Sequence, residues 1–136
     1  MTTIVARPWR DMGRSLTPAE VDVFDHIPRG IAVRARLYRV RHLPPHAHGM
    51  TFGRRVMLRR GHESNRKLIA HELVHVAQYA ERGHVRFLVR YLTDYARNLV
   101  RLRNHRQAYL AITAEVDARE GAAVWVTAHP DLLDGS

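Results

Sequence analysis

Residues 68–80 read LIAHELVHVAQYA, and this stretch decides the expected architecture because its apolar residues recur at helical spacing. We predict an amphipathic helix that packs its apolar side into the core. The polar run before it offers Ser64 or Asn65 as the helix cap, and Gly83 beyond it suits a left-handed helix end. The apolar side consists of Leu68, Ile69, Leu73, Val76 and Ala77.

Within this helix, His71-Glu72-Leu73-Val74-His75 is a pattern typical of zinc hydrolases. Positions four apart lie on one helix face, so the imidazoles of His71 and His75 can bind the same metal ion. Glu72 is placed to take a proton from a water on that metal, which makes it the candidate catalytic base. The alternative is a histidine-rich amphipathic helix whose two imidazoles lie one turn apart by chance.

Length and composition indicate one small domain with a single core, since the chain has 136 residues and 46% hydrophobic content. We expect an irregular N-terminal segment over residues 1–16 and one zincin-like catalytic domain over residues 17–130. No apolar run reaches 18 residues and residues 1–16 lack a continuous apolar signal, so we expect a cytoplasmic protein without a membrane span. The absence of cysteine leaves histidine and carboxylate as the strong zinc ligands.

The chain is strongly basic, with a formal net charge of +9, and Lys67 is its one lysine among 22 basic residues. Such a charge attracts nucleic acid, anionic membrane surfaces or acidic substrates. Several arginines fall near one stripe of the helix that is expected after the helix of residues 68–80, which we call the zinc helix. The favoured interpretation of this stripe is a solvated polar face. These arginines are Arg82, Arg86, Arg90, Arg97 and Arg101.

Before the zinc helix, the sequence predicts one short helix and two strands. Thr17-Pro18-Ala19-Glu20 carries a helix-start signal, with a threonine cap, a proline at the first position and a glutamate at the third. A turn cluster over residues 27–30 is expected to end that helix. Residues 31–41 alternate like a half-buried strand, and residues 50–58 read as a second extended segment antiparallel to it.

After the zinc helix, apolar residues at helical spacing predict a helix over residues 85–102. Residues 103–113 are expected to be a connection. An alanine-rich helix over roughly residues 114–128 should stop before His129-Pro130. The predicted fold class is therefore α+β, with a small antiparallel sheet, the zinc helix and two further C-terminal helices.

A catalytic zinc site needs a third protein ligand and one position left open for water. The downstream candidates are His84, Asp94, His105, Glu115, Asp117 and Glu120. Glu115 begins a helix of small residues, which would let it approach the zinc helix closely. The carboxylates of Asp117 and Glu120 point about 200° and 140° away from it around that helix. This makes Glu115 the favoured ligand and leaves the other candidates open.

Three segments in order, HELVHVAQY, FLVRYLTDY and AYLAITAEVDAREG, resemble the short bacterial gluzincin-type zinc peptidase domains related to HtpX-like membrane peptidases. Residues 49–56 also resemble that family's G-x-T-x-G-x-x-I strand at the rim of the cleft. The resemblance covers about residues 30–125 and implies zinc as cofactor and Glu115 as third ligand. The chain departs from the family pattern at Thr113, where proline is frequent, and at Asp117, where a second glutamate is usual.

Several other polar residues have two interpretations each. Gln78, three residues after His75, could bond a ligand or the substrate, although a place on the cleft floor is favoured. Tyr91, Tyr95 and Tyr109 could donate to an oxyanion, although packing with a satisfied hydroxyl is the commoner role.

The pattern as a whole predicts a zinc-dependent metallopeptidase that acts on a peptide or protein. An extended peptide could add along the strand of residues 50–58. One alternative is a catalytically silent zinc-fold module that binds or scaffolds. Another is a nucleic-acid-associated protease, which the basic charge suggests but which the absence of a cysteine-rich zinc ribbon disfavours.

Overall fold

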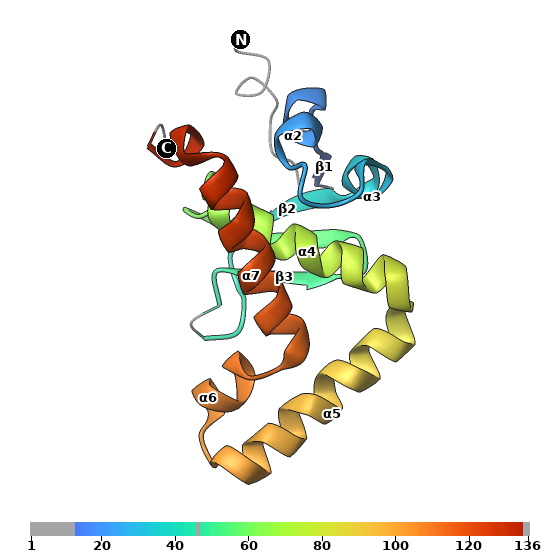
Figure 1. Cartoon of the computed structure of the whole chain (residues 1–136), viewed down its shortest axis with the longest axis vertical. Coiled ribbons are helices and arrows are strands. Elements are labelled where there is room, and N and C mark those ends of the chain that lie inside the picture. The colour runs from blue at the N-terminus through green and yellow to red at the C-terminus, as the bar shows by residue number, and fades with distance from the viewer. Residues whose placement is uncertain (1–12, 46, 135–136) are drawn as a thin grey trace.

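The structure is a computed structural model that describes residues 13–45 and 47–134, and it has the predicted α+β class (Figure 1). The four strands are β1 (Arg14–Ser15), β2 (Arg36–Val40), β3 (Gly49–Phe52) and β4 (Arg55–Arg59). The helices up to and including the one that carries His71 and His75 are α2 (Pro18–Val23), α3 (Arg29–Arg34) and α4 (Arg66–Arg82). Those after it are α5 (His84–Leu102), α6 (His105–Leu110), α7 (Thr113–Ala128) and α8 (Pro130–Asp134).

The sheet has the order β1-β2-β4-β3 and is mixed. Residues 50–58 are not one extended segment: they turn at Gly53, whose φ is +63°, and form the antiparallel hairpin of β3 and β4. Strand β4 then pairs with β2 in parallel, with Leu37 opposite Val56. The expected antiparallel pairing of the two segments was therefore wrong, because the hairpin reverses the chain before it meets β2.

Three local expectations also need correction. Residues 31–34 belong to helix α3 and not to a strand. The buried residues Ala32 and Ala35 fit a helix followed by a strand as well as they fit a continuous strand, so the sequence pattern did not distinguish the two. The expected connection over residues 103–113 contains α6, which Asn104 caps by accepting a hydrogen bond from the Gln107 amide at 2.9 Å. Of the segment 1–16 that was expected to be irregular, residues 1–12 lie outside the described residues. Its residues Arg14–Ser15 form strand β1, which pairs with β2, so this part of the segment is regular.

The predicted helix start at Thr17 is confirmed. The Glu20 amide donates to the Thr17 hydroxyl at 3.1 Å, and the Thr17 amide donates to a Glu20 carboxylate oxygen at 2.8 Å. The same carboxylate accepts two hydrogen bonds from the Arg14 guanidinium, at 2.7 and 3.0 Å, so β1 and α2 are joined directly. Helix α2 ends at Val23, ahead of the expected turn cluster.

Helix α4 lies at the centre of the molecule, between the sheet and α7 (Figure 1). Its cap is Asn65, whose side chain accepts from the Leu68 amide at 3.1 Å. On the sheet side, Leu73 packs in one core with Leu37 and Val56, and all three are fully buried.

Small residues on α7 allow the close crossing of α4 and α7. Ala118 and Ala122 are buried. A Cβ added at Gly121 would lie 2.9 Å from Cγ2 of Val74, so no larger side chain fits there without a shift. In the first turn of α7, Glu115 reaches His71 and His75 on the polar face of α4.

Helix α5 leaves the end of α4 and runs away from the sheet (Figure 1). Of its residues, Phe87 and Asn98 are buried, whereas Val85 and Val100 are 75% and 77% exposed. Among the described helices, none is long and apolar enough to cross a membrane.

Candidate metal centre

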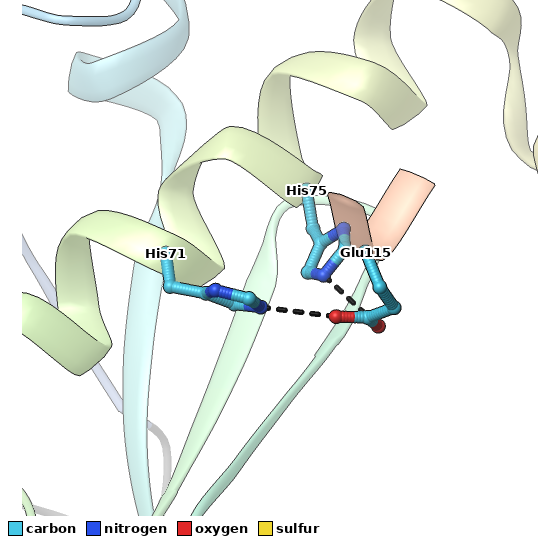
Figure 2. A group of neighbouring side chains, drawn as sticks. All are labelled: His71, His75 and Glu115. Atoms are coloured by element: carbon cyan, nitrogen blue, oxygen red, sulfur yellow. Dashed lines mark hydrogen bonds and ion pairs between the residues drawn. The ribbon is translucent and has the colours of Figure 1, made fainter. Parts of the chain in front are cut away.

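His71, His75 and Glu115 meet where α4 crosses the first turn of α7. Figure 2 shows both imidazoles on one side of α4, directed at the Glu115 carboxylate. Nε2 of His71 lies 3.0 Å from Oε1 of Glu115, and Nε2 of His75 lies 3.2 Å from Oε2. The structure therefore brings together the three residues that the sequence favours as ligands, although their binding of a metal stays a prediction.

The donor set fits a zinc ion. One nitrogen or oxygen from each residue lies within 4.8 Å of the others, and within the described residues this is the one such group of three. A tetrahedral ion with bonds of about 2 Å holds its ligand atoms roughly 3.3 Å apart. The spacings of 3.0 and 3.2 Å from Glu115 to the two imidazoles are close to that geometry. A divalent ion would also neutralise a carboxylate that is only 3% exposed.

Gln78 fixes the ring of His75. Its amide nitrogen donates to the Ala114 carbonyl at 3.1 Å, so its oxygen is the atom that faces His75. The Nδ1–H of His75 donates to this oxygen at 2.7 Å, which directs Nε2 toward Glu115. The structure therefore matches the interpretation of Gln78 that was not favoured, a bond to a candidate ligand, and the same side chain ties α4 to α7.

Tyr91 orients the carboxylate from the other side. Its hydroxyl donates to Oε2 of Glu115 at 2.5 Å, and this contact joins α5 to the site. Burial, then the nearby Glu115 charge, raises the pKa of Tyr91, so the phenol keeps its proton. Burial and Glu115 also raise the pKa of Tyr109, which is 43% exposed beside the site. Tyr95 instead bonds Nδ1 of His105 at 2.6 Å, away from the site.

Glu115 and His75 favour the charged form in each other. Burial alone would raise the pKa of Glu115, but the hydrogen bonds from His71 and His75 outweigh it and hold that pKa well below its ordinary value. Burial opposes the charge on His75, and the Glu115 carboxylate overcomes this and raises the pKa of His75. The carboxylate is thus ionised at neutral pH, as a metal ligand must be.

Glu72 lies beside this group on the sheet side of α4 and is 5% exposed. The Thr51 hydroxyl on β3 donates to its carboxylate at 2.7 Å and also contacts its carbonyl oxygen at 3.2 Å. Burial raises the pKa of Glu72, and the neighbouring His75 and His71 oppose that rise. A buried carboxylate with a raised pKa is suited to accepting and returning a proton near neutral pH.

A glycine, Gly49, lies close to this carboxylate. A Cβ at Gly49 would lie 3.2 Å from both Cγ and Oε2 of Glu72, tighter than an ordinary contact. The sequence places Gly49 and Thr51 in the G-x-T-x-G segment, but their contact with Glu72 follows only from the packing of β3 on α4.

The other candidates for third ligand lie elsewhere. Asp94 is 3.9 Å from the Arg90 guanidinium on α5. Asp117 and Glu120 are exposed on other faces of α7. His84 and His105 make ring contacts with aromatic side chains, Tyr79 and Tyr95 respectively.

Comparison with known families gives one match, to the eCIS core domain, over residues 40–83. This similarity spans the end of β2, the β3–β4 hairpin and α4, including His71, Glu72 and His75. It stops before α5 and Glu115. No curated protein and no solved structure matches the chain.

Proposed function

We propose that this chain is a zinc-dependent metallopeptidase, and the observation that carries the proposal is the convergence of His71, His75 and Glu115 beside a buried Glu72. A zinc ion held by the three ligands would supply Lewis-acid polarisation of the scissile carbonyl and an acidified water. The resemblance to gluzincin-type domains supports the same assignment.

The side chains of this site have separate roles in the proposal. Glu72 accepts a proton from the attacking water and returns it to the leaving amine, and Thr51 holds its carboxylate in place by the 2.7 Å hydrogen bond. Gln78 and Tyr91 keep His75 and Glu115 in their ligand orientations. The substrate is a peptide, whose main chain can pair with the edge of β3 that no other described strand occupies.

Metal content and peptide turnover test the proposal together. We expect about one zinc per chain by elemental analysis and cleavage of an unstructured peptide panel. Glu72→Gln should keep the zinc and lower turnover about 10²- to 10⁴-fold, the usual contribution of a general base. Glu120→Gln, an exposed carboxylate on α7, is the matched control and should change neither quantity.

Two results separate this function from its alternatives. A chain that binds zinc but cleaves no peptide would support the silent binding module instead. Undiminished turnover in zinc-loaded Glu72→Gln would show that the base has been assigned to the wrong residue.

A further inference from the structure

A concave site separate from the metal centre lies at the end of the sheet where the β3–β4 hairpin turns. It is a cavity of about 410 Å³ between the hairpin, the end of α3 and the last turns of α4. The arginines that line it are Arg34, Arg54 and Arg55, and its other walls include Phe52, Tyr79 and His84. No residue of the metal centre lines it.

The three arginines are free to bind a ligand. Their side chains are exposed, and none makes a hydrogen bond or ion pair with any residue that the structure describes. The lining contains no carboxylate. Unneutralised positive charge in a concave site with low-dielectric walls attracts an anion, and guanidinium groups match a carboxylate with paired hydrogen bonds.

The wall that carries two of these arginines is held in place. Gly53 has a φ of +63°, and a Cβ there would lie 2.3 Å from Nε2 of His84. The turn therefore packs directly on the first residue of α5. The rings of Phe52 and His84 lie 5.9 Å apart, and Phe52 and Tyr79 are also 5.9 Å apart, which gives the cavity an aromatic side.

The cavity adjoins the metal centre along two elements. Thr51 contacts Glu72, and the next residue, Phe52, lines the cavity. On α4, Tyr79 lies one turn after His75, about 6 Å along the helix axis. An extended peptide covers that distance with about two residues at roughly 3.3 Å each.

From this placement we propose that the Arg34–Arg54–Arg55 cavity binds an acidic side chain of the peptide whose scissile bond lies at His71, His75 and Glu115. The inference rests on the proposed function and adds a substrate class to it: peptides with a glutamate or aspartate about two residues from the cleaved bond. A cavity of this size accommodates one or two side chains, and its arginines come from two parts of the fold, Arg34 from the end of α3 and Arg54 and Arg55 from the β3–β4 hairpin.

The test compares two unstructured peptides that differ only in having glutamate or glutamine at every third position. That spacing places a carboxylate near the cavity whichever bond is cleaved. For the zinc-loaded chain we expect kcat/KM to be about tenfold higher for the glutamate peptide, in line with charge-assisted hydrogen bonds in a partly exposed site. The preference should weaken as salt is added.

Arg54→Gln with Arg55→Gln should reduce this preference to near one and leave the zinc content unchanged. Arg97→Gln with Arg106→Gln removes the same charge from exposed positions outside the cavity lining and should keep the preference. Equal turnover of both peptides by the unmodified chain would overturn the inference and leave the proposed function intact.

Fluorescence anisotropy of the labelled peptides, measured on Glu72→Gln, gives a readout that needs no turnover. Tighter binding of the glutamate peptide that depends on Arg54 and Arg55 would support the cavity even if no peptide is cleaved. An equal loss of affinity in the Arg97 and Arg106 control would show that net charge, and not the cavity, attracts the peptide.

Discussion

The two longest helices, α4 and α5, have nearly equal lengths of 17 and 19 residues but different relations to the core. Helix α4 has buried residues on the sheet side and on the α7 side, including Leu73 and His75, whereas α5 buries Phe87 and Asn98 and leaves a row of valines exposed. A buried helix can hold polar groups in fixed positions because neighbours constrain it on several sides. A peripheral helix contributes to the site through single contacts such as that of Tyr91.

The strongest test of this comparison removes a ligand from the buried helix. His75→Ala should lower zinc affinity by at least 100-fold, since loss of a partner of a ligand typically costs about 10- to 100-fold and a ligand contributes at least as much. Zinc competition titration measures the change. His105→Ala, on the exposed α6, should leave the affinity unaltered. Stoichiometric zinc retained at wild-type affinity by His75→Ala would place the metal elsewhere.

The core on the sheet side of α4 should dominate stability. Leu73→Ala is expected to lower the free energy of unfolding by about 2–5 kcal/mol, because a fully buried leucine leaves a cavity. Leu92→Ala makes the same chemical change on α5, where the side chain is 60% exposed, and should cost less than about 1 kcal/mol. Urea denaturation of both variants in the metal-free state checks this. Equal destabilisation would mean that α5 is covered in solution.

The contribution of α5 to the site is expected to be smaller and specific. Tyr91→Phe removes the hydroxyl that donates to Glu115 and should weaken zinc binding about tenfold, the lower end for such supporting contacts. Tyr95→Phe, one turn later on α5, breaks only the bond to His105 and should not change zinc affinity. If the two variants behave alike, the contact with Glu115 does not orient the ligand.

The smallest expected effect on stability is at the β1 edge of the sheet, opposite β3, where Arg14 and Glu20 join β1 to α2. This pairing lowers the pKa of Glu20 against the opposing effect of burial. A depressed pKa stabilises the folded state above the unfolded value near 4.5, and that stability is lost as the pH falls through the lower folded pKa. Glu20→Gln should therefore cost about 1 kcal/mol at pH 7 and less at pH 3.

Denaturation at both pH values measures the Glu20 effect. Asp22→Asn is the control, because its pair with Arg29 is largely exposed. A deficit for Glu20→Gln that does not shrink on acidification would show that the carboxylate acts through packing and not through its charge.

The sequence alone determined the parts of this protein that depend on local periodicity and local hydrogen bonding. The start of α2 at Thr17 and the helix that carries His71 and His75 follow from spacings of three and four residues, which the backbone geometry converts directly into contacts. The sequence could also favour Glu115 as third ligand, because small residues around it indicate a helix that packs closely.

Only the tertiary structure decided which strands pair and what surrounds the ligands. Residues 50–58 have apolar residues suited to a strand, but β-pairing joins distant segments, and the turn at Gly53 made the β2–β4 pair parallel. Thr51, Gln78 and Tyr91 reach the site from three different elements. The contacts of Thr51 with Glu72, of Gln78 with Ala114 and of Tyr91 with Glu115 depend on how β3, α4, α5 and α7 pack, and no spacing along the chain encodes that packing.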